Sequence, residues 1–274
     1  MKQESSPGDE VRLAFEGPVA TITIDRPAVR NAMDRDAWTV LAGHLEAVTR
    51  SDARVLVLAG AGGHFCAGAD TSARRHADLH PLDRLGHVTA PLVALQELPI
   101  PVVAKVDGPA VGAGLSLALA ADLVVATTRS RFGTAFARRG LSLDTGSSWL
   151  LPRVVGLQTA KRLAYLAETL DAEEARRLGL VTWLVPPGEV DAFTADLALR
   201  LAAAPPVAVR LDKELLGRSH ERSFREAVAA ENIAQVVNVG TDSPTAREAH
   251  ARGERPVFTG RWRGRPVPSD QGDT

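Results

Sequence analysis

Twice in this chain, an apolar strand leads through a glycine-rich loop into a helix. The runs RVLVLA at 54–59 and PVVAKV at 101–106 suit buried strands. The first is followed by the loop GAGGHFCAGAD at 60–70. The second is followed by DGPAVGAG at 107–114 and an apolar helix at 115–121. Because strands alternate with helices, the sequence predicts an α/β layered fold with both loops at one edge of the sheet.

The flanking segments extend this pattern. Two strands are predicted at 11–15 and 19–24, and a helix capped by Asp34 follows them. Beyond residue 140 the chain is predicted to be mostly helical, with one last short strand. The expected elements in this region are a strand at 181–184 and helices at 192–203, 206–216, 221–237 and 243–251. A further helix is expected earlier in the chain, at 91–98.

We expect four parts along the chain. These are a disordered tail at 1–10, an α/β core at 11–203, a helical C-terminal region at 204–262 and a second tail at 263–274. The C-terminal helices carry apolar faces, including Phe224 and Ile233. Such faces either cover the chain's own core or pack onto a neighbouring subunit, and the sequence leaves both open.

Charge and cysteine content exclude several classes of protein. With 32 basic and 33 acidic side chains the net charge is −1, whereas a nucleic-acid-binding protein would be strongly basic. Cys66 is the only cysteine, so neither an internal disulfide nor a cysteine-rich zinc site is expected. No apolar run approaches the roughly 18 residues of a membrane span, and residues 1–10 are polar. We therefore expect a cytoplasmic protein without a membrane or nucleic-acid partner, a metal or a separate cofactor.

Aromatic residues are scarce, at 4% of the chain, so the core is expected to be built from Ala, Val and Leu. Three of the few, Phe132, Phe136 and Trp149, nevertheless fall within 18 residues of one another. We expect this stretch to contribute an apolar pocket.

The two glycine-rich loops are the strongest candidates for chemistry. Backbone N–H groups at the start of a helix lack intrahelical partners, and the helix dipole favours negative charge there. Two such groups converging from two loops would hold a developing oxyanion. Alternatively, the glycines serve only tight turns and close packing. A dinucleotide fingerprint is excluded because position 117 is Leu, and a phosphate-binding loop is excluded because no G-K-[ST] follows.

Six motifs, in order, resemble the enoyl-CoA hydratase/isomerase (crotonase) superfamily, and most closely its ring-1,2-epoxyphenylacetyl-CoA isomerase and enoyl-CoA isomerase branch. They are DRPAVRNAMD at 25–34, HFCAGAD at 64–70, VDGPAVGAGLSLALAAD at 106–122, FGTAFARRGLSLDTGSSWLLPRVVG at 132–156, LDAEEARRLGLV at 170–181 and RPVFTGR at 255–261. The resemblance implies a spiral of ββα units with a helical C-terminal trimerisation region. It also implies a homotrimer or homohexamer that acts on acyl-CoA thioesters.

The resemblance further implies a set of site residues. The N–H groups of Ala69 and Ala113 would form the oxyanion hole. The residues expected to bind the acyl-CoA are Ala28, Arg30, Ala32, Ala67, Gly68, Asp70, Thr71, Ser72, Gly112, Ser116, Phe136 and Trp149.

One departure from the family pattern bears on the reaction. The two glutamates with which hydratases activate water fall at Ser116 and Phe136, and neither can act as a carboxylate. Asp144 is the carboxylate that remains in this region, and it matches the catalytic aspartate of isomerase branches. We expect an acyl-CoA isomerase with Asp144 as the proton-shuttling base. The alternatives are a hydratase with an atypical site, an aryl-CoA dehalogenase-like hydrolase and a CoA-binding scaffold. Asp144 could also be merely the N-cap of the following helix.

Overall fold

The computed structural model describes residues 10–70 and 80–263, and the chain divides into two compact units, Met1–Leu201 and Ala202–Thr274. The boundary expected from the sequence lies two residues further on. Most of both expected tails falls outside the described residues, but Glu10 and Arg263 at their inner ends make contacts. Glu10 pairs with Arg26, and the Arg263 N–H donates to the Gly240 carbonyl at 2.8 Å.

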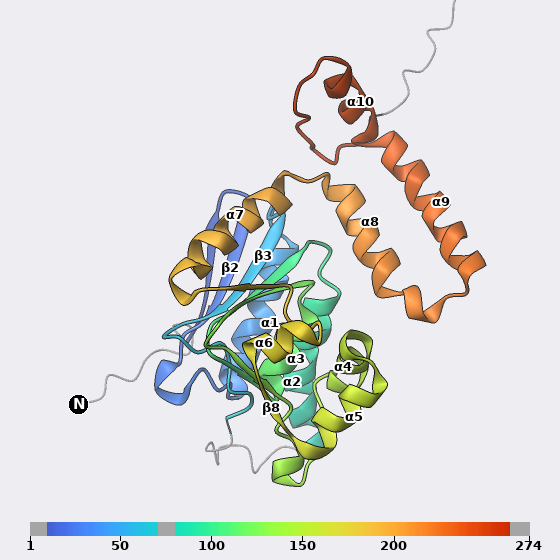
Figure 1. Cartoon of the computed structure of the whole chain (residues 1–274). Coiled ribbons are helices and arrows are strands. Elements are labelled where there is room, and N and C mark those ends of the chain that lie inside the picture. The colour runs from blue at the N-terminus through green and yellow to red at the C-terminus, as the bar shows by residue number, and fades with distance from the viewer. Residues whose placement is uncertain (1–9, 71–79, 264–274) are drawn as a thin grey trace, which may run out of the picture. The chain divides into compact units, whose positions relative to one another are not determined.

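A six-stranded sheet forms the centre of the first unit (Figure 1). Its strands, in spatial order, are β1 (Val11–Glu16), β2 (Val19–Ile24), β3 (Val55–Gly60), β4 (Val102–Val106), β6 (Leu123–Thr127) and β9 (Trp183–Val185). β1 and β2 form an antiparallel hairpin, and every later pairing is parallel. Parallel strands end at the same edge, so the loops after β3 and β4 emerge side by side, as the sequence predicted.

A second, three-stranded sheet was not predicted. It contains β5 (Pro109–Val111), β7 (Arg131–Gly133) and β8 (Thr169–Asp171), in that order. Three-residue strands lack the length at which alternating patterns become recognisable, which explains the omission. The sheet matters because β5 forms the middle of the second glycine-rich loop. It anchors that loop to β7 through parallel pairing of Ala110 with Phe132.

The helices of the first unit are α1 (Arg35–Thr49), α2 (Pro81–Gln96), α3 (Ala113–Ala120), α4 (Ser147–Val155), α5 (Leu157–Leu166), α6 (Ala172–Arg177) and α7 (Val190–Ala203). The Asp34 side chain accepts from the Ala37 N–H at 2.9 Å, so the predicted cap of α1 is confirmed. α2 begins ten residues before the expected start at 91, with Pro91 inside it. The expected strand at 181–184 is displaced to Trp183–Val185. α2 packs against both α1 and α3 beside the sheet (Figure 1).

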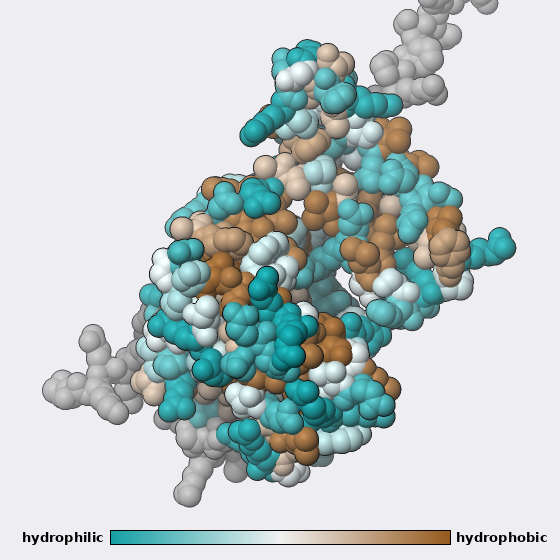
Figure 2. All heavy atoms as spheres, in the orientation of Figure 1, coloured by the Kyte–Doolittle hydropathy of each residue, from teal (hydrophilic) through white to brown (hydrophobic). Residues whose placement is uncertain are grey.

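The second unit consists of α8 (Pro206–Gly217), α9 (Phe224–Gly240) and α10 (Ser243–Ala251). Ser223 and Glu226 form a capping box at the start of α9. Asp242 accepts from the N–H groups of Thr259 and Gly260, which ties the segment after α10 back to the helices. Large apolar side chains on these helices stay exposed, among them Phe224 and Ile233, and α8 and α9 show apolar surface in Figure 2.

The core is aliphatic, as the composition predicted, and only a few large aromatics are fully buried, including Trp38, Phe65 and Phe132. Within the described segments, no single helix is long and apolar enough to cross a bilayer. The bent pair Pro187–Ala203 and Pro206–Gly217 passes that test only when the two helices are taken together.

Candidate functional site

The two glycine-rich loops are hydrogen-bonded to each other. The Cys66 N–H donates to the Pro109 carbonyl at 2.9 Å, and the Val111 N–H donates to the Cys66 carbonyl at 3.0 Å. These bonds form a parallel bridge between Cys66 and Ala110. Burial raises the pKa of the Cys66 thiol to about 12, so this residue is a neutral packing group at the junction.

Two glycines allow this close approach. A Cβ on Gly114 would lie 2.1 Å from the Cys66 carbonyl oxygen, which no side chain tolerates. Gly68 has φ +93°, and a Cβ there would lie 2.7 Å from the Val111 carbonyl oxygen and 3.4 Å from the Ala113 nitrogen. Close packing therefore places Gly68 directly beside the start of α3.

The N–H groups of Ala69 and Ala113 point away from the hydrogen bonds that the carbonyls of the preceding residues, Gly68 and Gly112, accept. The Gly68 carbonyl accepts from the Met33 N–H at 2.8 Å, and the planar peptide points the Ala69 N–H the opposite way. The Gly112 carbonyl accepts from the Ser116 N–H at 3.2 Å, so the Ala113 N–H points out of the α3 N-terminus. Neither N–H donates a backbone hydrogen bond to any residue that the structure describes. The structure thus places Gly68, the residue before Ala69, beside the Ala113 nitrogen, so the two N–H groups expected to form the oxyanion hole belong to adjoining segments.

The segment that carries Ala28, Arg30 and Ala32 lies along the first loop. The Ala67 N–H donates to the Arg30 carbonyl at 3.1 Å, and the Asp70 N–H donates to the Met33 carbonyl at 2.8 Å. Ala28 and Arg30 are exposed, and Arg30 adopts φ +56°. Six of the residues expected to bind acyl-CoA, together with Ala69, therefore form one continuous strip in which Gly68 is buried: Ala28, Arg30, Ala32, Ala67, Gly68, Ala69 and Asp70. Thr71 and Ser72 lie outside the described residues.

Two residues that the sequence reasoning missed hold this strip in place. The fully buried Asn31 donates its amide to the carbonyls of Ala61 (2.9 Å) and His64 (2.5 Å) and accepts from the Arg26 N–H at 2.8 Å. The Arg26 guanidinium, whose side chain is only 10% exposed, pairs with Asp34 at 2.6 Å and approaches Asp70 at 3.7 Å. Arg and Asn stand inside the motif at 25–34, so the signal was present but unused.

A separate ion pair between Asp107 and Arg129 holds the start of the second loop. Asp107 accepts from the Arg129 Nε at 2.6 Å and from the Thr127 hydroxyl at 2.8 Å. Burial alone would raise the pKa of Asp107, but the bonds from Arg129 and Thr127 outweigh it and lower the pKa. Asp107 therefore stays ionised and structural.

Asp144 is not the cap of α4, and that alternative is wrong. Gly146 occupies the N-cap position with φ +81°, and no side chain caps the helix. Only the Asp144 main-chain carbonyl takes part, accepting from the Ser147 N–H at 2.9 Å. Burial raises the pKa of the half-buried Asp144 carboxyl, and a hydrogen bond from Thr145 lowers it in part. A carboxyl with a raised pKa is suited to proton transfer.

Buried hydroxyls connect Asp144 to α3. The Thr145 Oγ1 lies 3.0 Å from the Asp144 Oδ1 and 2.7 Å from the Ser116 Oγ, which in turn lies 2.7 Å from the Ser147 Oγ. Ser116 is one helical turn after Ala113, so the carboxyl stands beside the turn that supplies the second N–H donor. Ser116 itself is fully buried, with its hydroxyl in this network.

The aromatic candidates flank the carboxyl along the chain. Phe136 is 8% exposed and precedes a short 3-10 turn, Ala137–Arg139. Trp149 is partly buried in α4, and the Arg153 guanidinium covers its ring at 3.7 Å from the centroid. The Trp149 ring thus packs partly against the core and partly against the Arg153 guanidinium.

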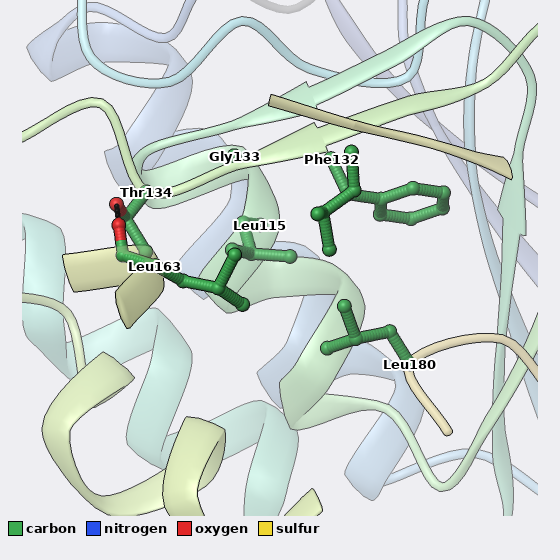
Figure 3. A pocket seen from close by; sticks show the side chains of 7 residues that line it. Leu115, Phe132, Gly133, Thr134, Leu163 and Leu180 are labelled. Carbon is green, nitrogen blue, oxygen red and sulfur yellow. Dashed lines mark hydrogen bonds between the residues drawn. The ribbon is translucent and has the colours of Figure 1, made fainter. Parts of the chain in front are cut away.

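An apolar pocket lies behind α3, between that helix, β7 and α5 (Figure 3). It has no room for a water molecule. Its lining residues are Leu115, Phe132, Gly133, Thr134, Leu163, Leu170 and Leu180, and the Thr134 hydroxyl is engaged with the Leu163 carbonyl at 2.9 Å. This space is a gap in the packing between apolar side chains. The described residues also contain no group of three or more His, Cys, Asp or Glu side chains that could hold a metal ion.

Comparison with known proteins identifies the class and then the family. The fold is the crotonase fold: an enoyl-CoA hydratase/isomerase from Cupriavidus metallidurans superposes with a TM-score of 0.85 at 36% identity, over 94% of this chain and 98% of that one. Residues 14–254 match the family described as enoyl-CoA hydratase/isomerase. The chain belongs to the enoyl-CoA hydratase/isomerase family, whose members bind acyl-CoA thioesters.

Two curated relatives show how the family divides. A 1,2-epoxyphenylacetyl-CoA isomerase from Escherichia coli is 36% identical over 254 residues, covering 90% of this chain and 97% of the relative. A short-chain-enoyl-CoA hydratase from Clostridium acetobutylicum is 32% identical over 231 residues, covering 82% and 88%. Membership makes the chain an enzyme of this family, while the two names stand for different reactions on acyl-CoA.

Proposed function

We propose that this enzyme is an acyl-CoA isomerase in which Asp144 moves a proton between two carbons of the acyl group. The observation that carries the proposal is the environment of Asp144. Its carboxyl is half-buried, has no capping role, and is joined by hydroxyls to the helix that presents the Ala113 N–H. A base for this reaction must stand near the oxyanion donors, because the proton leaves the α or γ carbon of the acyl group while the resulting charge collects on the thioester oxygen.

In the proposed reaction the thioester oxygen accepts from the N–H groups of Ala69 and Ala113. Asp144 removes a proton from the α or γ carbon, and the electron pair of the broken C–H bond moves onto that oxygen as an enolate. The same carboxyl then returns the proton to another carbon, so the double bond shifts and no atom is gained. Loss of one fixed donor in sites of this kind costs about 3–4 kcal/mol of transition-state stabilisation.

Two positions near Asp144, Ser116 in space and Phe136 in sequence, support isomerisation over hydration. Hydration in the family is implied to use two glutamates, and here those positions hold the buried Ser116 hydroxyl and the buried Phe136 ring. Neither ionises, so one carboxylate remains, and one suffices for a proton shuttle. Trp149 and Phe136 would form apolar walls that exclude water from the reacting carbon.

The strip from Ala28 to Asp70 would hold the CoA portion. Arg30 is exposed and makes no ion pair with any described residue, so its guanidinium is available to a CoA phosphate. Gly112, with φ +58°, would let the acyl group approach the start of α3 closely.

The proposal also extends to assembly and compartment. The exposed apolar side chains of α8 and α9 would pack between subunits of a homotrimer or homohexamer. The near-neutral chain would work in the cytoplasm.

Proton exchange in deuterated water tests the proposed base directly. Wild-type protein and Asp144→Asn are incubated with a panel of aliphatic and aryl acyl-CoA thioesters, and mass spectrometry follows deuterium at the α and γ carbons. We expect exchange by the wild type and a loss of about 10²- to 10⁴-fold in Asp144→Asn. CoA binding measured by calorimetry should persist in the variant, since the strip is separate from the carboxyl.

Other outcomes point to the alternatives. Addition of water to crotonyl-CoA with Asp144 intact would indicate an atypical hydratase. A covalent adduct on Asp144 with a halogenated aryl-CoA would indicate a dehalogenase-like hydrolase. Undiminished exchange in Asp144→Asn would refute the assigned base, and CoA binding without any exchange would favour a scaffold.

A further inference from the structure

The hydroxyls of Ser147, Ser116 and Thr145 form a continuous buried chain that ends on the Asp144 carboxyl. Successive oxygens are separated by 2.7, 2.7 and 3.0 Å. Ser147 and Ser116 are fully buried and Thr145 is 3% exposed, so bulk water does not compete for these bonds. Three hydroxyls, from two helices and the turn before the second, thus lie in series, and the last of them contacts one carboxylate oxygen.

The Thr145 hydroxyl is placed to donate both to the Asp144 Oδ1 and to the Ser116 Oγ, while either hydroxyl can be the donor between Ser116 and Ser147. Each hydroxyl has a single hydrogen, and an ionised carboxylate only accepts. An ionised carboxylate is a stronger acceptor than a hydroxyl, so we assign the single Thr145 hydrogen to the Asp144 Oδ1, and Ser116 then supplies the hydrogen that lies between its own oxygen and the Thr145 oxygen. Ser116 in turn accepts from Ser147. All three hydroxyl dipoles then point toward the carboxylate and strengthen one another.

The two oxygens of Asp144 consequently differ. Oδ1 is held by Thr145, whereas Oδ2 makes no hydrogen bond or ion pair with any residue in the described segments. Among the charged groups on the adjacent elements, Arg153 stacks on Trp149 and Arg138 reaches the Thr169 hydroxyl at 3.4 Å, while Arg139 is exposed. The hydroxyl chain is therefore the polar partner of this carboxyl, and burial is the opposing influence on its pKa.

We propose that Ser147, Ser116 and Thr145 are positioning residues that act as a one-directional hydroxyl chain, fixing Oδ1 of Asp144 as an acceptor and leaving Oδ2 as the oxygen that exchanges the proton with the acyl-CoA. This rests on the proposed function of Asp144. When Oδ2 takes the proton from carbon, Oδ1 becomes the carbonyl-type oxygen of the acid and still accepts from Thr145. The chain then keeps one orientation through the whole cycle, as preorganised donors should. It replaces a hydratase glutamate with a support for a different base.

The opposite arrangement has an opposite consequence, which makes the idea testable. If Thr145 instead donated to Ser116, removal of the Ser116 hydroxyl would free the Thr145 hydrogen for Asp144 and lower the pKa of the carboxyl. In the proposed direction, Ser116→Ala removes a donor that polarises Thr145, so the carboxylate is less stabilised and its pKa rises. The sign of the shift distinguishes the two.

The experiment measures the pH profile of deuterium exchange in wild type, Ser116→Ala, Thr145→Ala and Thr145→Ser. We expect the acidic limb to move to higher pH in Ser116→Ala and further in Thr145→Ala, whereas Thr145→Ser should restore the wild-type midpoint. Ser130→Ala is the matched control, because its buried hydroxyl donates to the Val106 carbonyl at 2.9 Å and belongs to another network. It should lower thermal stability and leave the midpoint in place.

Carboxyl ¹³C NMR of aspartate-labelled protein, with the Asp144 resonance assigned by its absence in Asp144→Asn, gives the same titration without any substrate. An unchanged or lowered pKa in Ser116→Ala would overturn the chain even if Asp144→Asn abolishes exchange. Exchange that survives Asp144→Asn would instead overturn the proposed function, so the two failures are separable. A uniform loss of rate at every pH, with a fixed midpoint, would show only a structural role and would also reject the chain.

Discussion

The proposed active site has two halves, which consist of different chemical groups. The oxyanion half, around Ala69 and Ala113, is made of main-chain groups held by glycine contacts and by the buried amide of Asn31. The base half, around Asp144, is made of side chains: one carboxyl and three hydroxyls. A backbone site is fixed by sterics and allows no intermediate geometry, whereas a hydroxyl chain can be shortened one link at a time. The first half should therefore fail abruptly and the second gradually.

The largest effect is expected from Gly68→Ala. A Cβ at this position would meet the Val111 carbonyl oxygen at 2.7 Å, and φ +93° is strained for any L side chain. The change must move the Ala69 N–H or the start of α3, so exchange should fall by about 100-fold or more. The fall in rate is measured by deuterium exchange with an acyl-CoA that the wild-type protein converts. Calorimetry of CoA binding shows whether the site still folds.

Gly43→Ala is the matched control for that change. Gly43 lies inside α1, and a Cβ there would meet nothing within 4 Å. Since Ala is the better helix former, this variant should gain up to about 1 kcal/mol in the free energy of unfolding and keep the wild-type exchange rate. If Gly68→Ala behaved like Gly43→Ala, the oxyanion half would not be sterically fixed and the contrast between the halves would collapse.

A smaller but still sharp effect is expected from Asn31→Ala, which tests whether one buried amide supports the backbone half. The change leaves the carbonyls of Ala61 and His64 without their donor and places Ala at φ +57°. We expect a loss of about 2–3 kcal/mol in the free energy of unfolding, measured by urea denaturation. CoA affinity should fall with it, because the strip at 28–32 loses its anchor.

Asn238→Ala is the comparison for this amide. The Asn238 side-chain oxygen in α9 is buried and has no hydrogen-bond partner among the described residues. Its removal should therefore cost less than the removal of Asn31. An equal or greater loss in Asn238→Ala would mean that the Asn31 bonds add little beyond side-chain packing.

The contrast between the halves also explains what the sequence could and could not predict. The long strands, the Asp34 cap and the placement of both loops at one sheet edge follow from patterns of apolar residues and from glycine. The choice of Ala69 and Ala113 as a pair came from the family resemblance, and the glycines at 68, 112 and 114 are the part of that motif whose steric role the structure shows. The three-residue strands β5, β7 and β8 were not predictable, because three residues show no periodicity.

Asp144 was predicted, but the hydroxyl network beside it was not, and for a different reason. Ser116, Thr145 and Ser147 are ordinary residues whose meaning arises only when α3 and the turn before α4 come together. Local sequence even suggested that Asp144 caps α4, and the structure shows Gly146 in that place. A site built from main-chain groups requires glycines that can be recognised in the sequence. A network of side chains that forms only through tertiary contacts has no such local pattern.

The smallest effect expected is on stability, in Asp144→Asn as a function of pH. Burial raises the pKa of Asp144 in the folded protein above its unfolded value, so the ionised carboxylate weakens the fold. This penalty is absent below the unfolded pKa, grows as pH rises through the two values, and is complete above the folded pKa. Asn cannot ionise and still offers an amide oxygen to Thr145. Asp144→Asn should therefore gain stability over wild type at neutral pH, and the gain should shrink toward acidic pH in urea denaturation series. A constant difference across pH would mean that burial does not raise the pKa, and the base half would lose its physical argument for proton transfer.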